Sequence, residues 1–314
     1  MARTTFEVEG ARLDAATFAA RHPAWVRDPA ALRALVRTPR GLALPPLPAP
    51  PRDALFDPWR DAMLAIAAPR QELKLGSGPV KPKPDGSFAH GTAAFLPSSH
   101  WPVCGRCSTH LELCLQLAPS MVGPWLHRPG ALVLMYCFAC LPGSPETTYL
   151  RIVEPRTLAT RPAGPTASSS HTSTTQTRGV TVLPPSWRVP DSMWFRYRLD
   201  GEDLGGAAAV LLGREEIVAE TEGEDGEDEE VGTFDAYDEW AERFNARGRR
   251  GDGALGGYPN WEQDDATPAC PACRAPMEHL LDWNGEQFLD GALHVFMCER
   301  TPACGKELEF VAEF

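Results

Sequence analysis

The sequence predicts an α+β fold that is mainly β, built from two pseudo-symmetric modules with peripheral helices near the N-terminus. Two observations lead to this prediction: a four-cysteine pattern that occurs twice, and an apolar run that precedes the second cysteine pair of each copy. The patterns are Cys104, Cys107, Cys137 and Cys140, then Cys270, Cys273, Cys298 and Cys304. High counts of proline (31) and glycine (27) favour loops and short strands over long helices.

Both patterns have the spacing of a metal site. Two cysteines separated by two residues can bind one ion from a single tight turn, and a second pair completes a tetrahedral shell. In a reducing compartment, paired cysteines are metal ligands more often than disulfides. We therefore expect eight of the nine cysteines to hold two structural zinc ions. The spacing does not exclude iron, and free thiols or disulfides are the other alternative.

The similarity between the copies extends beyond the cysteines. Gly130 and Gly291 each stand seven residues before a cysteine, with an apolar run between. The copies close on similar segments, residues 149–153 and 308–311. This shared order indicates an internal duplication. It predicts that each cysteine pair lies at the tip of a hairpin, with backbone N–H groups directed at the sulfurs, and that each apolar run is a buried strand.

We divide the chain into four regions. They are an N-terminal helical or docking region (1–72), a first zinc module (73–155), a stretch of flexible Ser/Thr loop, strands and acidic segment (156–254), and a second zinc module (255–314). The N-terminal region is expected to contain a strand at 6–9 and helices at 28–36 and 58–67.

The third region has a mixed composition. Residues 163–178 are polar and cannot bury enough apolar area to offset their ordering entropy, which predicts a flexible loop. Residues 180–183 and 194–199 have the composition of strands. Tyr237, Trp240 and Phe244 have helical spacing, so a helix is expected from residue 233.

The net charge of −12 has a local source. Residues 215–239 contain 13 acidic residues and no basic ones, so the rest of the chain carries +1. An acidic run repels nucleic-acid phosphates and attracts basic proteins, although a solvated loop that only aids solubility is an equally simple interpretation. The longest apolar stretch, residues 131–141, is too short to span a bilayer as a helix. We expect a cytoplasmic protein that binds neither nucleic acid nor membrane.

Catalytic signatures are absent from the sequence. It contains no His-Glu-x-x-His, no Gly-x-Ser-x-Gly and no phosphate-binding loop, and a complete four-thiolate shell leaves no position for a substrate. Cys114 with His110 could be a nucleophile and base, but a buried cysteine among leucines is the simpler interpretation. We interpret His127 and His294 as packed or surface histidines rather than ligands. No catalytic residue is therefore assigned.

Several segments resemble the bacterial YwqG-like family, which has no established activity. They are residues 74–79 (Lys-Leu-Gly-Ser-Gly-Pro), the Trp-Pro at 101–102, the segment 111–117 with its glutamine, residues 255–263 (Leu-Gly-Gly-Tyr-Pro-Asn-Trp-Glu-Gln) and residues 290–296. The resemblance covers about 75–155 and 255–314. It departs from the family pattern at Ser77, where a glycine is expected, and at residues 277–282, where a glutamine is expected. It bears on fold more than on function.

The duplicated four-cysteine arrangement, with His127 and Arg128 ahead of an apolar strand, also resembles the programmed cell death protein 2 family. Those eukaryotic proteins escort a newly made small-subunit ribosomal protein. This resemblance implies two structural zinc ions and a protein partner.

Together these observations predict a non-catalytic, zinc-stabilised protein-binding protein. We expect its partner to be a protein, and the acidic run favours a basic one. The chain would act on this partner either as an escort or as an immunity-type inhibitor that neutralises a toxin. The alternative is an enzyme or a small-molecule-binding protein that uses the cleft between the modules.

Overall fold

The computed structural model describes the parts of the chain that form its main sheet and both cysteine clusters. These are residues 5–8, 11–14, 37–50, 64–91, 93–97, 101–126, 128–140, 146–157, 176–190, 240–245, 251–261, 267–284, 292–300, 304 and 307–313.

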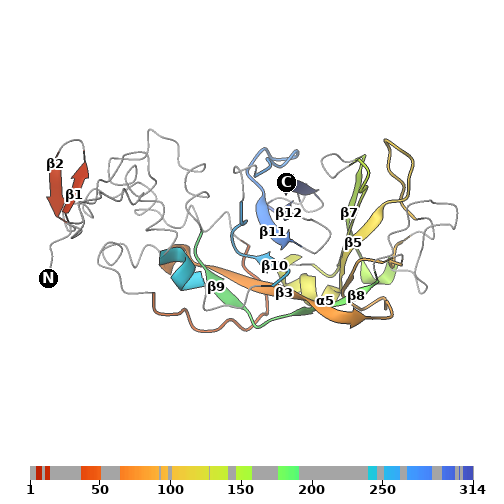
Figure 1. Ribbon diagram of the computed structural model, residues 1–314, viewed down its shortest axis with the longest axis horizontal. Coiled ribbons are helices and arrows are strands. Elements are labelled where there is room, and N and C mark those ends of the chain that lie inside the picture. Colours follow the sequence, from red (N-terminus) through yellow and green to blue (C-terminus); the bar gives the residue numbers. More distant parts are fainter. Residues whose placement is uncertain are drawn as a thin grey trace, which may run out of the picture.

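An eleven-stranded antiparallel sheet forms most of the described structure (Figure 1). Its strands are β3 (Ala68–Pro79), β4 (Phe88–Ala89), β5 (Glu112–Leu117), β6 (Ala131–Tyr136), β7 (Thr148–Val153), β8 (Arg178–Val182), β9 (Ser186–Arg188), β10 (Gly253–Gly256), β11 (Glu278–Trp283), β12 (Ala292–Cys298) and β13 (Glu307–Glu313). The order is β13-β12-β11-β10-β3-β8-β4-β5-β6-β7, and β9 also pairs with β3. A separate hairpin joins β1 (Thr5–Val8) and β2 (Ala11–Asp14).

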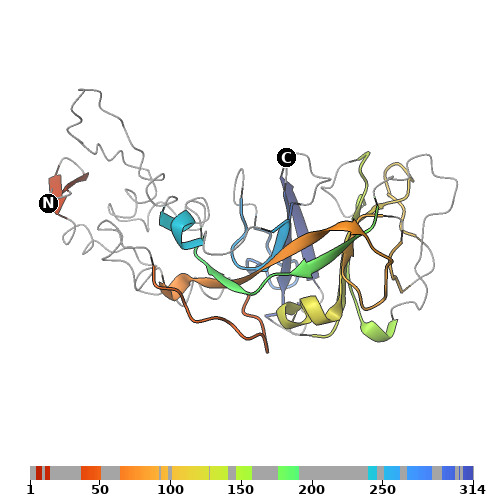
Figure 2. The same cartoon turned by 60° about the horizontal axis from the view of Figure 1, so that its bottom comes forward.

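The sheet consists of two meanders joined by a central strand pair. Strands β4 to β7 form one meander and β10 to β13 form the other, while β3 and β8 pair between them (Figure 2). In that central pair Leu73 faces Val182 and Leu75 faces Val180. The two edge strands, β7 and β13, approach each other, so the sheet is nearly closed. We refer to the meanders as the first half and the second half.

Three apolar clusters explain why the sheet curls in this way. The largest lies between the halves and takes leucines from β3, β5, β6, β11 and β12 together with Trp125 and Trp283. Side chains of β7 and β13 pack against the same cluster. A smaller cluster lies beneath each cysteine group, on the opposite face of the strands. Strands β6 and β12 are buried along their whole length because both of their faces are covered.

Helix α5 (Pro119–Leu126) closes the bottom of the central cluster (Figure 2). Its Pro119 occupies the first turn, where a missing N–H costs nothing, and Trp125 and Leu126 are fully buried. The remaining helical pieces are the 3-10 turn η2 (Pro155–Thr157) and residues 64–66 and 240–245. Among the described residues, no helix is long and apolar enough to cross a membrane.

The prediction of a mainly β fold is confirmed. The expected strands at 6–9 and 180–183 correspond to β1 and β8, and the apolar run at 131–136 forms the buried strand β6. The similar closing segments at 149–153 and 308–311 lie in β7 and β13. Strand β3 begins at Ala68, ahead of the boundary that we drew at residue 73. The expected helix at 28–36, most of that at 58–67, the strand at 194–199, most of the polar loop and the acidic segment lie outside the described residues.

Candidate metal centres

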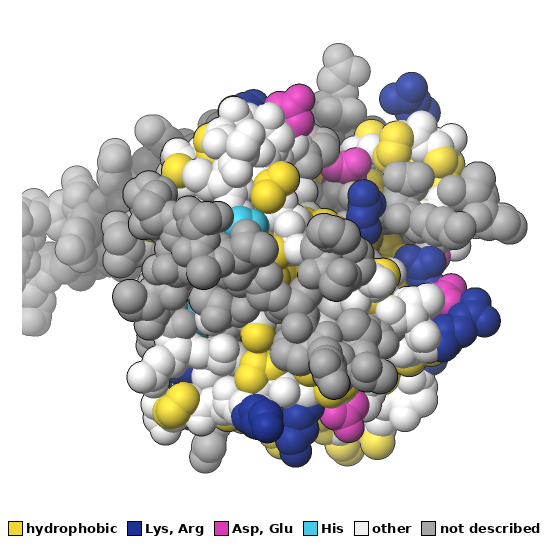
Figure 3. Space-filling view, turned by 90° about the vertical axis from the view of Figure 1, so that its right-hand side faces the viewer, with side chains coloured by type: hydrophobic (Ala, Val, Ile, Leu, Met, Phe, Trp, Pro, Cys, Tyr) yellow, Lys and Arg dark blue, Asp and Glu magenta, His cyan; other side chains and the backbone are white. Residues whose placement is uncertain are grey.

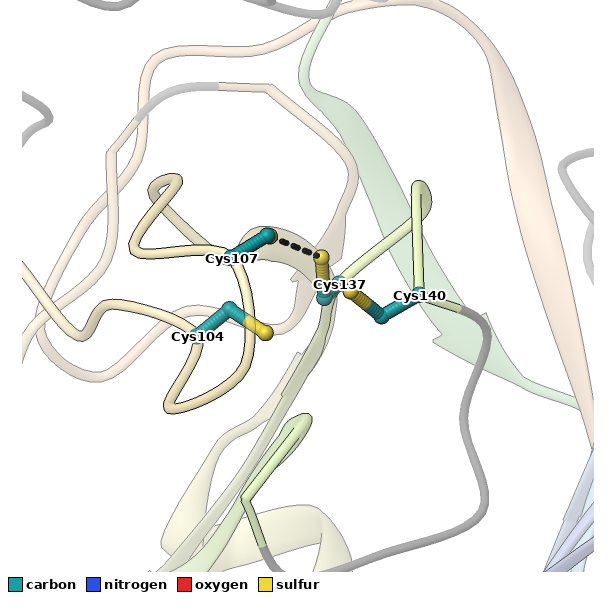
Figure 4. A group of neighbouring side chains, drawn as sticks. All are labelled: Cys104, Cys107, Cys137 and Cys140. Carbon is teal, nitrogen blue, oxygen red and sulfur yellow. Dashed lines mark hydrogen bonds between the residues drawn. The ribbon is translucent and has the colours of Figure 1, made fainter.

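The first cysteine group lies where β5 begins and β6 ends, at the same edge of the sheet. Cys104 and Cys107 occupy a turn closed by the bridge between Val103 and His110, and Cys137 directly follows β6. Figure 4 shows the sulfurs of these residues and of Cys140 gathered between the two turns. All four sulfurs lie within 4.8 Å of one another.

The backbone of the first turn explains its shape. The Cys104 N–H donates to Thr109 O (2.8 Å), and the Ser108 N–H donates to Cys104 O (2.9 Å). Ser108 has φ of +59°, a left-handed conformation that lets the chain reverse within a few residues. The Arg106 N–H points at Cys104 Sγ (3.4 Å), as the sequence predicted for this hairpin tip. Such N–H donors favour a thiolate over a thiol.

The second cysteine group is built on the same turn. The Cys270 N–H donates to Ala275 O (2.8 Å), the Arg274 N–H donates to Cys270 O (2.7 Å), and Arg274 has φ of +62°. Cys298 ends β12, and Cys304 completes the set. Here too the four sulfurs lie within 4.8 Å of one another.

The sulfur separations fit a metal shell. Cys107 Sγ lies 3.4 Å from Cys137 Sγ, and Cys273 Sγ lies 3.7 Å from Cys298 Sγ. A disulfide needs about 2.05 Å, whereas thiolates at about 2.3 Å from one tetrahedral ion lie roughly 3.8 Å apart. None of the nine cysteines, all of which the structure describes, is in a disulfide. Each cluster can therefore hold one metal ion, and the four-sulfur set is compatible with zinc.

The two clusters differ in exposure and in proton affinity. Cys107 is exposed, and a hydrogen bond with the Thr109 hydroxyl (2.9 Å) is the main cause that lowers its pKa to about 6. The neighbouring Cys107 sulfur and burial raise the pKa of Cys140 to about 12. Burial raises the pKa of Cys298 to about 12. Cys107 is thus the thiolate that is ready to receive a cation at neutral pH, and metal binding must displace protons from Cys140 and Cys298.

A third group of ligand-type side chains lies within the second half. His279 and Asp282 come from β11 and His294 from β12, and all three are buried. His279 Nε2 lies 2.8 Å, and His294 Nδ1 2.6 Å, from the same carboxylate oxygen, Asp282 Oδ1. Burial alone would raise the pKa of Asp282, but His279 and Arg70 lower it well below its usual value.

Arg70 of β3 connects this group to the centre of the sheet. It donates to Asp282 Oδ2 (2.7 Å), to Tyr258 O (3.0 Å) and to Glu72 Oε1 (3.1 Å). Arg188 of β9 donates to the same Glu72 oxygen (2.9 Å). Each buried carboxylate in this network therefore has a guanidinium partner, which is how proteins accommodate buried charge.

Cys114 and three histidines are the other residues that the sequence analysis considered as possible ligands or catalytic groups. Cys114 is fully buried in the central cluster among leucines, apart from the cluster beneath Cys104 and Cys137, and burial raises its pKa well above the usual range. This agrees with the packed interpretation. His110 is half-buried in the first turn, and His127 lies outside the described residues. His294 is buried, but its pairing with Asp282 was missed.

No protein-family model matches this chain. A search of curated proteins finds no match either.

Proposed function

We propose that the protein is a non-catalytic scaffold, built from two pseudo-symmetric zinc-stabilised modules, that binds a basic protein partner. The observation that carries this proposal is the pair of four-cysteine clusters. Four thiolates fill a tetrahedral zinc shell and leave no ligand position for a substrate, so ions held there stabilise structure rather than perform chemistry.

Corresponding registers in the two halves support the duplication. Gln116 faces Val133 where Asp282 faces His294, and both β5 and β11 carry a bulge at the same point. His90 (φ +63°) follows β4, and Gly256 (φ +66°) ends β10, at matching positions of the meanders. In the central pair Leu73 faces Val182 and Leu75 faces Val180. A two-fold axis between β3 and β8 would relate the two strands with this register. The proposed likeness to the YwqG-like and programmed cell death protein 2 families rests on this duplicated plan.

The basic partner is inferred from charge and from exposed apolar groups. Residues 215–239 carry 13 carboxylates and no basic group, which attracts a positively charged surface and speeds its association. Beside the first cluster, Val103 is 54% and Phe138 53% exposed, so large apolar side chains are available for contact. Such a partner suits two roles in the cytoplasm, escort of a basic protein or inhibition of a basic toxin.

A capture experiment at low salt tests the proposal. The full-length protein is compared with a variant in which the seven acidic residues at 222–230 are changed to glutamine or asparagine. We expect one basic protein to bind the unaltered chain in stoichiometric amount, to dissociate as salt rises, and to be lost from the variant while metal content stays the same. If no capture depends on the acidic residues, the basic-partner proposal fails. Whether the protein keeps its partner soluble or blocks its activity separates escort from inhibitor.

A pocket at the seam of the sheet supports a second candidate function, small-molecule binding. It has a volume of about 710 Å³, and its lining includes Leu150 and Ile152 of β7 and Leu308 of β13. Its charged residues are Arg128, Arg151, Arg156 and Glu154, so the lining has a net positive charge although Glu154 pairs with Arg156. The arginines favour an anionic ligand with an apolar part. The end of the molecule that carries β7 and β8 likewise shows basic side chains beside hydrophobic ones (Figure 3).

Native mass spectrometry of the purified protein tests this candidate. A bound small molecule should be retained by the unaltered chain and lost when Leu150→Trp fills the pocket. Arg106→Gln, an exposed change outside the pocket, serves as the control and should leave binding unaltered. If the mass of the native protein equals that of the chain plus its metal ions, no such ligand is bound.

A further inference from the structure

The group formed by His279, Asp282 and His294 owes its geometry to a β-bulge. Residues three apart on a regular strand point to opposite faces of the sheet. The register of β11 shifts between His279 and Leu281, and the extra residue turns His279 and Asp282 to the same face. His294 lies directly opposite Asp282 on β12, so the three side chains meet on one side of the sheet.

We propose that His279, Asp282 and His294 bind a divalent transition-metal ion, which gives the protein a third metal site of a different kind from the cysteine clusters. Two imidazoles and one carboxylate are the ligand set of zinc and of non-haem iron sites that keep open coordination positions. The proposal does not depend on the protein-binding function or on which metal the cysteines hold.

The hydrogen-bond pattern around His279 requires either a second proton or a metal ion between its ring and Asp282. Its Nδ1 lies 3.2 Å from Gly257 O, and a carbonyl can only accept, so Nδ1 carries the proton in a neutral ring. Nε2 then presents a lone pair to Asp282 Oδ1 at 2.8 Å. The carboxylate is ionised, because Arg70 donates to its other oxygen. Two lone pairs can face each other at this distance only with a positive centre between them, a second proton or a metal ion.

The surroundings of the group have the features of a metal site. A carbonyl that holds the far nitrogen of a histidine fixes the tautomer that ligates, as Gly257 O does for His279. Arg70 holds the carboxylate from behind through Oδ2 and leaves Oδ1 for the ion. The rings of Trp261 and Phe296 pack on the imidazoles. The ring centroids of Trp261 and His294 lie 4.6 Å apart, and those of Phe296 and His279 lie 5.5 Å apart. This apolar shell excludes water and strengthens the attraction between ion and ligands.

The first half provides an internal control, because it keeps the bulge but lacks the ligands. The positions of His279, Asp282 and His294 are occupied there by Leu113, Gln116 and Val133. Leu113 and Val133 simply pack in the cluster beneath the first cysteine group. The fold therefore does not need three ionisable groups at these positions. A buried polar cluster that the fold does not require points to a specific role.

Admitting an ion requires a small movement of the histidines. Ligand atoms about 2.1 Å from one ion, at angles near 100°, lie roughly 3.2 Å apart. The nitrogens now lie 2.8 Å and 2.6 Å from Oδ1, so each must retreat by about half an ångström. Three ligands leave at least one coordination position open. This site, unlike a complete four-thiolate shell, can thus accept a further ligand.

Metal counting on the full-length protein tests the proposal. The protein is saturated with Co²⁺, excess ion is removed, and bound cobalt per chain is measured together with the absorption of thiolate-to-cobalt charge transfer. We expect three ions per chain, with only two contributing to that absorption. The matched variant, His279→Leu with Asp282→Gln and His294→Val, installs the side chains of the first half and should bind two ions with unchanged charge-transfer absorption.

The number of bound ions in the unaltered protein and in the triple variant decides whether the third site exists. Two ions in the unaltered protein, or three in the variant, would overturn the proposal; the first result would mean that His279 is a buried imidazolium paired with Asp282. Asp282→Asn is a second variant of nearly equal volume, and it should weaken the third ion at least about tenfold without affecting the other two. If the triple variant fails to fold, the count in the unaltered protein and in Asp282→Asn still decides.

Discussion

Each half of the sheet carries a four-cysteine cluster on a turn with the same backbone hydrogen bonds, yet the two clusters differ in burial and in the ion pairs near them. In the first cluster Cys104 and Cys137 are buried, but Cys107 is exposed and lies near the exposed side chains of Val103 and Phe138. In the second cluster Cys270, Cys298 and Cys304 are fully buried. Behind that cluster the second half has buried ionic contacts through Arg70 and through Arg37, and the described residues of the first half show no counterpart of these.

The difference shows that the geometry of the four ligands and their burial have separate structural causes. The turn and the strand ends place four sulfurs together in both halves, so ligand geometry is a local property. Burial is a property of the surroundings, and it decides how much of the fold depends on each cluster. The second half should therefore respond more strongly to the loss of its metal than the first.

The largest effect is expected for Cys270→Ser. This change removes a fully buried ligand, so we expect loss of one metal ion per chain and a fall in the free energy of unfolding of roughly 4 kcal/mol or more. Metal analysis and thermal unfolding measure both quantities. Unchanged metal content and melting temperature would contradict the four-cysteine site.

Cys107→Ser is the comparison in the first half, made at its exposed ligand; the positional counterpart of Cys270 is Cys104, which is also buried. Cys107→Ser should also lose one ion, but it should lower the melting temperature less than Cys270→Ser, because an exposed serine remains hydrated. An equal or larger loss would show that burial does not set the dependence of each half on its metal.

A smaller but substantial effect is expected for Arg37→Met. The buried guanidinium donates to Trp125 O (2.7 Å) and pairs with Glu278 (3.1 Å) and Glu299 (2.6 Å). Its loss removes the guanidinium partner of Glu278 and leaves Glu299 only the more distant Arg128 (3.9 Å), at a cost of about 3–5 kcal/mol at neutral pH. Burial already raises the pKa of Glu278, so this carboxyl group is protonated more readily in the folded state than in water. The cost should therefore shrink as pH falls and grow as pH rises through that pKa, measured by urea unfolding across pH.

Arg156→Met is the control for this prediction. Arg156 pairs with Glu154 at 2.7 Å in the first half, but its side chain is 83% exposed. The change should cost less than about 0.5 kcal/mol, because water replaces the partner. Similar losses of stability for Arg37→Met and Arg156→Met would refute the conclusion that the buried ion pairs of the second half stabilise the fold more than the exposed pair of the first half.

The sequence predicts the cysteine turns and the strands that lead into them, because both depend on local signals. A pair of cysteines two residues apart specifies a turn, and the apolar runs that became β6 and β12 specify buried strands. The packing of Cys114 was predictable for the same reason, since its neighbours are leucines.

Other features depend on contacts between residues far apart in the chain. The pairing of β3 with both β8 and β10 joins the halves into one sheet, and no periodicity in the sequence indicates it. The same holds for His279, Asp282 and His294, whose meeting requires a bulge and a cross-strand register. Arg37 reaches Glu278 across 241 residues of sequence. A lone histidine, aspartate or arginine carries no signal of such a partner.

A smaller loss of stability than for Cys270→Ser or Arg37→Met is expected for Gly256→Ala. This variant tests the contact between β10 of the second half and α5. Gly256 has φ of +66°, and an added Cβ would lie 1.9 Å from the ring of Trp125, which is fully buried and cannot easily move. Gly41 offers a control, since it has φ of +72° with no atom within 4 Å of an added Cβ. Gly41→Ala should cost about 1 kcal/mol for the left-handed backbone alone, whereas Gly256→Ala adds overpacking for a total of about 2–4 kcal/mol. Equal costs would mean that Trp125 yields freely, and that the second half is held to α5 by Arg37 rather than by packing.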